Sequence, residues 1–218
     1  MEVLANENVV IKANKYYDEI DDLVKYINSY IVPIFDYLSL STNKMCNIRL
    51  LDSKEELDLL YKELMQSEGE KNSHKEVPSN IASFIYENDL FILNYESFID
   101  VYQHNRTTQE EFFGEIVGNL VSIFQTWKYG KLTDNPIINK GLAVYLSGQD
   151  INSKILIDSY IDLKRSNSIK AYGNFYKYID NTLDREGINK LLSNNIDEDR
   201  LRKIYDGYKH QFLSNRGK

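Results

Sequence analysis

The chain has 218 residues, of which 42% are hydrophobic and 27% charged, a composition typical of a soluble globular protein with one sizeable domain. Its formal net charge is −7, and its Lys and Arg residues are scattered among Asp and Glu, which argues against a nucleic-acid partner. The single cysteine, Cys46, excludes an intramolecular disulfide and a cysteine-based zinc cluster.

The first residues carry no targeting signal. Residues 1–17 lack a basic segment followed by a continuous apolar run, so we expect no signal peptide. No apolar run approaches the roughly 20 residues that a membrane span needs. We therefore expect a cytoplasmic protein that has no membrane partner.

The N-terminal part of the sequence predicts two strands separated by a helix. Residues 8–13 and 45–52 are short runs rich in β-branched and apolar residues, as in strands. Between them, apolar residues recur at three- and four-residue spacing from Tyr16 to Leu38, which predicts an amphipathic helix. Pro33 should kink or divide this helix, because proline removes a hydrogen-bond donor and crowds the preceding turn.

A second helix and a hairpin follow. Ser53 and Glu56 have the spacing of a capping box, which predicts a helix from about Lys54 to Met65. Residues 66–80 are polar and contain Gly, Pro and Ser, as in a loop. Residues 81–95 contain two apolar runs around Glu87-Asn88-Asp89, which predicts a β-hairpin.

The rest of the chain is predicted to be helical. A helix capped by Thr107 or Thr108 should run to about Trp127, and another should begin at Pro136 and end near residues 147–148. Three further helical segments follow residue 153, and Gly187 resembles a helix C-cap. The predicted fold class is α+β, with a small mixed or antiparallel sheet and packed helices in a first lobe (8–105) and a helical second lobe (106–218).

Two segments after the hairpin resemble a known enzyme family. The words "EEFFGEIVGNLVSIFQ" and "INKGLAVYLSGQ", together with the order of elements, resemble the gluzincin zinc metallopeptidases, especially the short bacterial peptidase MA-like domains. In that family a hairpin precedes a helix with the motif H-E-x-x-H, and the next helix begins with a word such as N-E-G-x-A. The resemblance covers residues 8–213 and implies a single metallopeptidase-like domain.

The positions that carry the chemistry of this family are all changed. The family's two histidines bind one zinc ion from one helix face, and the glutamate beside the first acts as general base. Gly118 and Ser122 stand where the histidines would be, Asn119 where the general base would be, and Lys140 where the third ligand would be. The resemblance therefore implies no zinc, no cofactor and no catalytic residue.

Four residues remain candidates for a role in the cleft that the resemblance implies. Lys140 would place an ammonium group in the former metal cavity, where it could pair with Glu111 or Glu115. Tyr172, in "AYGNFY", matches a position where family members place a tyrosine near the cleft, although packing in the core or in the cleft wall is the favoured explanation. An unrelated amphipathic helix with Ile116 and its apolar neighbours facing a core is the alternative interpretation of the first word.

These observations lead to a functional hypothesis with two alternatives. The first is a catalytically inactive metallopeptidase-like protein, or pseudopeptidase, that binds a protein or peptide through its cleft or through the edge of the hairpin at 81–95. A hydrolase with a non-zinc site around Glu111, Glu115 and Lys140 is the second hypothesis. The third is a structural interaction protein unrelated to peptidases. The sequence does not indicate the oligomeric state.

Overall fold

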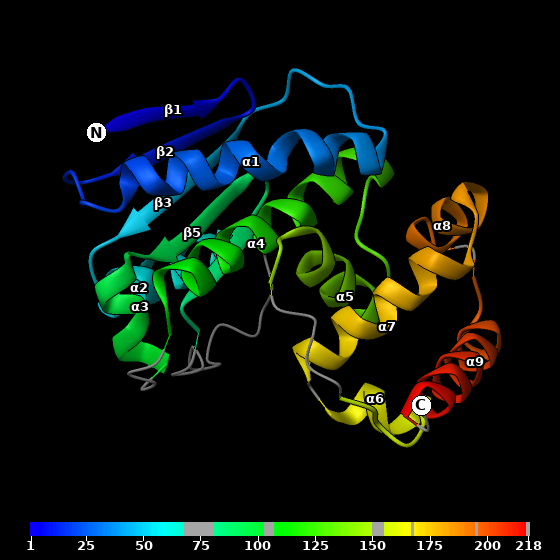
Figure 1. The fold of residues 1–218 in the computed structure, drawn as a ribbon. Helices are drawn as coiled ribbons and strands as arrows, with labels where there is room; N and C mark the ends of the chain where they lie inside the picture. The colour runs from blue at the N-terminus through cyan, green and yellow to red at the C-terminus, as the bar shows by residue number, and fades with distance from the viewer. Residues whose placement is uncertain (68–80, 103–106, 150–154, 167, 195, 217–218) are drawn as a thin grey trace. The chain divides into compact units, whose positions relative to one another are not determined.

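The computed structural model describes residues 1–67, 81–102, 107–149, 155–166, 168–194 and 196–216. These residues form five strands and nine helices, so the α+β class predicted from the sequence is confirmed (Figure 1). All the strands precede residue 94, and helices make up most of the rest of the described chain. None of the described helices is both long and apolar enough to cross a membrane.

The chain forms two compact units. The first unit comprises Met1–Phe35 and Ser41–Ile123, and the second comprises Asp36–Leu40 and Phe124–Lys218. Two helices, which end at residues 38 and 129, begin in the first unit and end in the second.

A five-stranded mixed sheet is the centre of the first unit. Its strand order is β1-β2-β3-β5-β4; β2, β3 and β5 run parallel, whereas β1 and β4 are antiparallel edge strands. The predicted strands at 8–13 and 45–52 and the hairpin at 81–95 are confirmed. The strands are β1 (Glu2–Asn6), β2 (Val9–Ala13), β3 (Cys46–Leu51), β4 (Ser83–Tyr86) and β5 (Asp89–Leu93).

Strand β1 was missed by the sequence analysis, because its residues do not form an apolar run. Only one side chain of the strand, Ala5, is buried, and Leu4 is 65% exposed. A buried asparagine fixes the turn into β2: the Nδ2 of Asn8 donates to the carbonyl oxygens of Thr42 (3.0 Å) and Lys44 (2.9 Å). Contacts far away in the sequence therefore determine where β1 turns into β2.

The helices of the first unit agree with the sequence except at three points. Pro33 was expected to kink or divide the first helix; it does not divide it, because the helix continues through this exposed proline. Tyr16 was expected on the buried stripe of that helix, but it precedes the helix and is 52% exposed. Helix α3 was not predicted. The helices are α1 (Ile20–Leu38), α2 (Lys54–Ser67), α3 (Tyr95–Tyr102) and α4 (Gln109–Tyr129).

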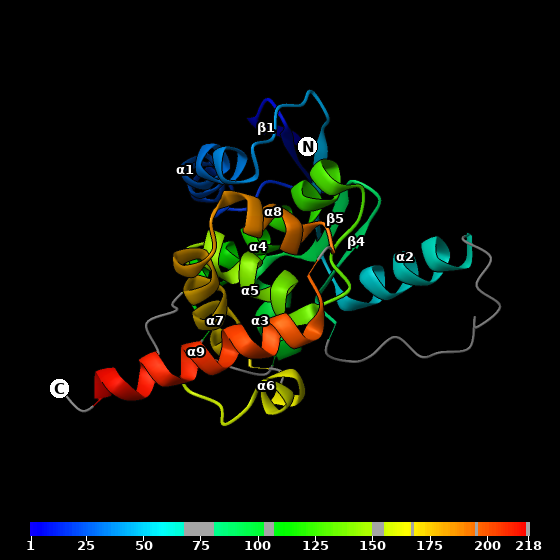
Figure 2. The ribbon, with the colours of Figure 1, turned by 90° about the vertical axis from the view of Figure 1, so that its right-hand side faces the viewer.

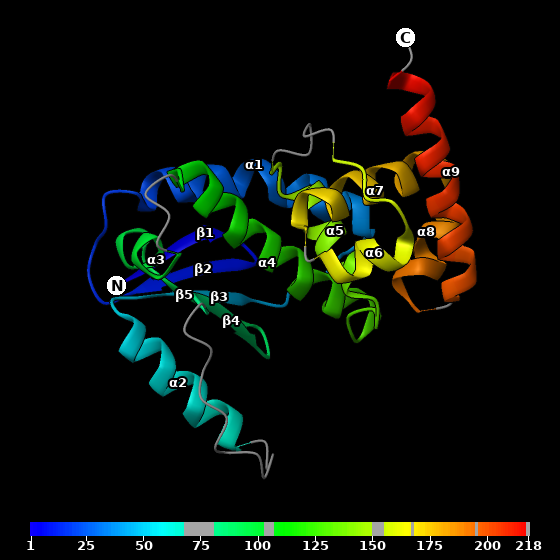
Figure 3. The ribbon, with the colours of Figure 1, turned by 90° about the horizontal axis from the view of Figure 1, so that it is seen from below.

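Helices lie on both faces of this sheet (Figure 3). Alternate strand residues such as Ile11, Ile48 and Leu90 share one face and are fully buried, and α1 and the first part of α4 lie on that side. Tyr61 of α2 meets the ring of Phe84 on the opposite face, with ring centroids 5.2 Å apart. Apolar side chains on both faces thus form the core of the first unit.

The second unit is helical, as predicted. Its helices are α5 (Pro136–Leu146), α6 (Tyr160–Ser166), α7 (Ile169–Thr182), α8 (Arg185–Leu192) and α9 (Glu198–Arg216). The prediction that Gly187 ends a helix is wrong. Gly187 lies in the first turn of α8, where its backbone N–H donates to Oδ1 of the N-cap residue Asp184 at 2.8 Å. The predicted loop at 66–80 lies largely outside the described residues.

Helices α5 and α7 form the closest helix pair of the second unit. Gly141 of α5 faces the backbone of α7: a Cβ at this position would lie 2.7 Å from the carbonyl oxygen of Tyr172 and 3.0 Å from Cβ of Tyr176. A side chain of any size would force the two helices apart. The small residue of the word "NKGLA" therefore serves helix packing.

Candidate functional site

Three of the four positions that the resemblance aligns with the zinc ligands and the general base lie on α4 in the first unit. Gly118 is buried, and Asn119 and Ser122 are half-buried. The Nδ2 of Asn119 donates to the carbonyl oxygen of Glu115 at 2.9 Å, and the Ser122 hydroxyl lies 3.4 Å from the carbonyl oxygen of Gly118. Both side chains thus bind the backbone one turn earlier in their own helix, a common arrangement for Asn and Ser within a helix.

Glu111 has a structural partner that explains its position. The backbone N–H of Thr108 donates to Oε2 of Glu111 at 2.9 Å, and the N–H of Glu111 donates to the Thr108 hydroxyl at 3.1 Å. This reciprocal pair is a capping box, which satisfies two free donors at the start of α4. Thr108 is therefore the N-cap that the sequence predicted, and Glu111 already has a role that requires no substrate.

The other two candidates lie in the second unit. Lys140 is exposed on α5, and it forms no ion pair with an acidic residue in the described part of its own unit. Tyr172 of α7 is 2% exposed and packs in the core of its unit. The pairing of Lys140 with Glu111 or Glu115 stays a prediction. Within residues that the structure describes, no three His, Cys, Asp or Glu side chains are grouped as metal ligands would be.

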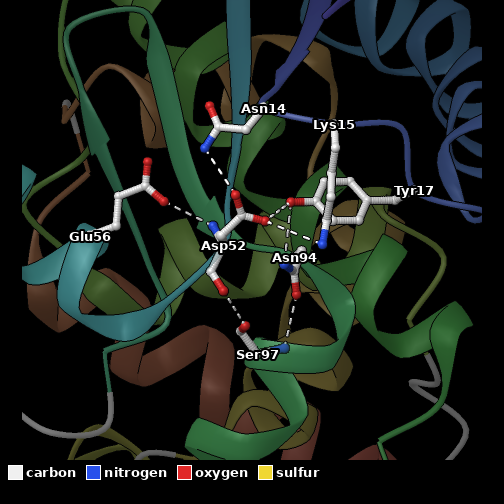
Figure 4. A network of polar contacts seen from close by, with 7 residues as sticks. All are labelled: Asn14, Lys15, Tyr17, Asp52, Glu56, Asn94 and Ser97. Carbon is white, nitrogen blue, oxygen red and sulfur yellow. Dashed lines mark hydrogen bonds and ion pairs between the residues drawn. The ribbon is translucent and has the colours of Figure 1, made fainter.

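A polar network that the sequence analysis missed lies at the carboxyl ends of the three parallel strands (Figure 4). Asn14 and Lys15 follow β2, Asp52 follows β3, and Asn94 follows β5. Tyr17, just beyond β2, also points into the network. The carboxyl ends of parallel strands are a common place for ligands in α/β proteins, so this network is the other candidate site.

Asp52 is the centre of this network. Its carboxylate accepts hydrogen bonds from the Tyr17 hydroxyl and from Nδ2 of Asn14 (3.0 Å), and Nζ of Lys15 lies 3.9 Å away. Its backbone N–H donates to Oε2 of Glu56 at 2.9 Å, and its carbonyl oxygen accepts from the Ser97 hydroxyl at 2.7 Å. The residue thus joins strands β2 and β3 to the first turns of α2 and α3.

The electrostatics of the network follow from these contacts. Hydrogen bonds from Tyr17 and Asn14 hold the pKa of the Asp52 carboxyl below its ordinary value. Burial, and then the hydrogen bond to Asp52, raise the pKa of Tyr17 to about 12, so this phenol remains a proton donor at neutral pH. A carboxylate and a protonated phenol that satisfy each other by a hydrogen bond stabilise this end of the sheet.

Asp52→Asn should change how stability depends on pH. Because the folded-state pKa of Asp52 lies below its unfolded-state value, the carboxylate stabilises the fold above the unfolded-state pKa, and this contribution is lost as the pH falls through the folded-state pKa. The difference in unfolding free energy between wild type and Asp52→Asn should therefore be largest at neutral pH and shrink below about pH 4.

Urea unfolding followed by circular dichroism at several pH values measures this difference. Glu55→Gln, which removes an exposed carboxylate from the first turn of α2, is the matched control. If the difference in unfolding free energy between wild type and Asp52→Asn stays constant from neutral to acidic pH, the carboxylate of Asp52 does not have the stabilising role assigned to it.

The edge strand β4 directs backbone groups away from the sheet in a regular pattern. The N–H of Leu93 donates to the carbonyl oxygen of Ala82 at 3.0 Å, so these residues form a hydrogen-bonded pair of the β4–β5 ladder. Such pairs alternate along an antiparallel ladder. Phe84 therefore directs its N–H and C=O groups towards β5, whereas Ser83 and Ile85 direct theirs away from the sheet. No strand of the described chain pairs with this side of β4.

The opposite edge of the sheet is protected. The register of β1 shifts between Leu4 and Asn6, and an irregularity of this kind disrupts pairing with a further strand. Glu2 of β1 forms an ion pair with Lys12 at 3.3 Å, which places charge at this edge. The four residues of β4 carry no charge, and their register is regular. Of the two edges of the described sheet, β4 is therefore the better suited to pair with another chain.

The two units differ strongly in charge. The first unit contains 10 Lys or Arg and 21 Asp or Glu residues, a formal charge of −11 with histidine neutral. The second unit contains 16 basic and 12 acidic residues, a formal charge of +4. The net charge of the whole chain, −7, does not show this difference. The difference becomes visible only when the charges are counted separately for each unit.

Comparisons with known proteins do not identify a relative. No family model matches the sequence, and neither the curated proteins nor the solved structures include a significant match. The likeness to gluzincin metallopeptidases therefore rests on the two sequence words and the order of elements.

Proposed function

We propose that this protein is a non-catalytic binding module on a metallopeptidase-like scaffold, and that its edge strand β4 accepts an extended segment of a partner protein. The observation that carries this proposal is the open, uncharged and regular edge of β4, with the backbone groups of Ser83 and Ile85 directed outward. An extended peptide that adds a strand to such an edge gains main-chain hydrogen bonds without any special side-chain chemistry.

The non-catalytic part of the proposal is supported by the residues that stand where the family has zinc ligands and a general base. Gly118 offers no side-chain donor atom, and Asn119 and Ser122 bind the backbone of α4. Asn and Ser are poor zinc ligands beside imidazole or thiolate. The hydrolase alternative loses support because the carboxylate of Glu111 is engaged in the capping box of α4.

Selection from a random peptide display library, followed by affinity measurement with purified protein, tests the proposal. Ile85→Pro removes an outward N–H but no ladder bond to β5, so the fold should persist while the affinity of selected peptides falls by at least about 100-fold. Ile85→Ala keeps the N–H and should lose less affinity than the proline variant. Circular dichroism verifies that each variant is folded.

Leu4→Pro is the matched control at the other edge. The N–H of Leu4 also points away from the sheet, because Met1 and Ala13 form a hydrogen-bonded pair and the pattern alternates from there. This variant should leave the affinity unchanged. Equal losses for both proline variants, or peptides that bind Ile85→Pro as well as wild type, would overturn the proposed role of β4. One zinc ion per chain that survives dialysis would overturn its non-catalytic part.

A further inference from the structure

Two cationic side chains of the second unit bind the same residue, Ser39, directly after α1. The Nζ of Lys128, in the last turn of α4, donates to the carbonyl oxygen of Ser39 at 2.6 Å. The Nη2 of Arg185, at the start of α8, donates to the Ser39 hydroxyl oxygen at 2.9 Å. All three residues are exposed. Ser39 thus draws an ammonium and a guanidinium group together at the surface of this unit.

Neither cation is neutralised by a carboxylate of its own unit. No acidic side chain in the described part of the second unit forms an ion pair with Lys128 or Arg185, and this includes Asp36 in the last turn of α1. The carboxylate of Asp184 caps the first turn of α8, and that of Asp180 accepts two tyrosine hydroxyl groups. The formal charge of +4 on this unit adds a general attraction for anions.

The guanidinium group of Arg185 is held by a second contact besides Ser39. Its central carbon lies 5.1 Å from the ring centroid of Tyr37, which is the geometry of a cation–π interaction. The hydroxyl of Tyr37 donates to Oδ1 of Asp180 at 2.5 Å, so the ring is itself held in place. The guanidinium group is therefore pre-organised, and a ligand that binds it loses little affinity to the ordering of this side chain.

The contacts with Ser39 use only part of the hydrogen-bonding capacity of the two cations. A guanidinium group has five N–H donors and an ammonium group has three, and each gives one hydrogen bond to Ser39. The Ser39 hydroxyl oxygen accepts from Arg185, while its own proton goes to no acceptor in the part of this unit that the structure describes. Cations after a helix also interact favourably with its dipole, but that role needs none of these remaining donors.

The remaining donors suit a tetrahedral oxyanion. The planar fork of an arginine can bind two oxygen atoms of a phosphate group at once, and a lysine binds a further oxygen as a point charge. A serine hydroxyl adds one neutral donor. A carboxylate has only two oxygen atoms, so it cannot engage all three groups as fully as a phosphate group can.

We propose that Ser39, Lys128 and Arg185 form a binding site for a phosphate group. The site lies within the second unit and does not depend on the proposed addition of a strand to β4. It gives the protein a second kind of ligand, one that is recognised by charge and by hydrogen-bond donors.

Titration of the isotope-labelled full-length protein with inorganic phosphate, followed by NMR at constant ionic strength, tests the site. We expect a saturable shift of the backbone amide signals of residues 38–40, 128–130 and 184–186. Chloride at the same ionic strength should not shift these signals. A second titration with phenyl phosphate distinguishes the two sources of the group: tighter binding of this compound indicates a phosphate ester, and tighter binding of inorganic phosphate indicates the free ion.

Substitutions of the two cations should weaken phosphate binding. Arg185→Gln should do so about tenfold and Lys128→Gln about threefold, because each removes charge-assisted hydrogen bonds. Arg185→Lys keeps the charge but lacks the planar fork, so it should still weaken binding about threefold. Arg200→Gln removes an exposed guanidinium group from α9 and is the matched control. It should change the affinity by less than about twofold.

Ser39→Ala distinguishes a defined site from a surface that is only positively charged. It removes no charge and keeps the carbonyl acceptor of Lys128, yet it should weaken phosphate binding about threefold, because a donor and the anchor of Arg185 are lost. Circular dichroism verifies that each variant is folded.

Three results would overturn the inference. The first is a Ser39→Ala protein that binds phosphate as tightly as wild type, since the attraction is then only electrostatic. The second is an equal loss of affinity in Arg185→Gln and Arg200→Gln. The third is a titration in which no signal of residues 38–40 shifts. None of these results affects the proposed function of β4, which the display selection and Ile85→Pro test separately.

Discussion

Gly141→Ala should lower the free energy of unfolding by about 2 kcal/mol. The new methyl group would lie 2.7 Å from the carbonyl oxygen of Tyr172, a backbone atom that cannot move without shifting α7. Overpacking of this kind costs about 1–3 kcal/mol or more. The higher helix propensity of alanine returns up to about 1 kcal/mol, which limits the net loss. Urea unfolding followed by circular dichroism measures the change.

Gly207→Ala is the matched control for this substitution. Gly207 also lies within a helix of the second unit, but the atom that its Cβ would meet, at 2.7 Å, is the hydroxyl oxygen of Tyr178 at the end of a side chain. That side chain can turn away, so the variant should be as stable as wild type or slightly more stable. A Gly141→Ala protein that is as stable as Gly207→Ala would show that α5 and α7 can separate at no cost.

Local sequence signals predicted the elements that depend on local physics. The Ser53–Glu56 spacing and the candidate caps Thr107 and Thr108 predicted the starts of α2 and α4, because the hydroxyl of a cap residue accepts from the free N–H three residues along. Pro136 likewise identified the first turn of α5. These signals need no information about the rest of the chain.

The errors arise where one residue type fits two local structures. Gly187 suggested a helix end because glycine is common there, but Asp184 caps the start of α8 three residues earlier. Pro33 suggested an interruption, yet α1 continues because its buried stripe, which includes Ile31 and Ile34, packs on both sides of the proline. Tertiary packing outweighs local preference in such cases.

The candidate sites could be predicted only in part, because they depend on strand order. Asp52 and Asn94 each follow an apolar run, but nothing local indicates that β3 and β5 are neighbours and parallel. The open edge of β4 likewise follows from the order of the strands. A signal was present: polar residues stand directly after each of the three parallel strands. If the three strands had been assumed to pair in parallel, these polar residues would have been predicted to lie close together.

Asp180→Ala should lower the free energy of unfolding by about 2 kcal/mol, because this carboxylate joins three segments of the second unit. Its Oδ1 accepts from the Tyr37 hydroxyl at 2.5 Å, and its Oδ2 accepts from the Tyr145 hydroxyl at 2.7 Å. The Tyr37 hydroxyl also lies 3.2 Å from that of Tyr176. An intramolecular hydrogen bond contributes about 0.5–1.5 kcal/mol net, and one to a charged acceptor up to about 3 kcal/mol, so losing two bonds to this half-buried carboxylate accounts for the expected change.

The position of Asp180 in its helix makes its carboxylate depend more strongly on the hydrogen bonds from the tyrosine hydroxyls. It lies in the last turn of α7, where the helix dipole disfavours a negative charge by about 0.3–1 kcal/mol. Alanine removes this repulsion, which offsets part of the loss. Burial raises the pKa of all three tyrosines, that of Tyr145 to about 12, so the phenols stay protonated and the effect of the substitution should not vary between about pH 6 and 9.

A double-mutant cycle separates the energy of the hydrogen bond between Tyr145 and Asp180 from the energy of other contacts that the substitutions remove. Tyr145→Phe alone should cost about 1 kcal/mol, but it should cost almost nothing in the Asp180→Ala background, because its acceptor is already absent. Asp206→Ala, an exposed carboxylate of α9, controls for loss of charge and should change stability by less than about 0.5 kcal/mol. If Tyr145→Phe costs the same in both backgrounds, Asp180 does not hold α5 to α7. Apolar packing alone would then hold together the end of α1, α5 and α7.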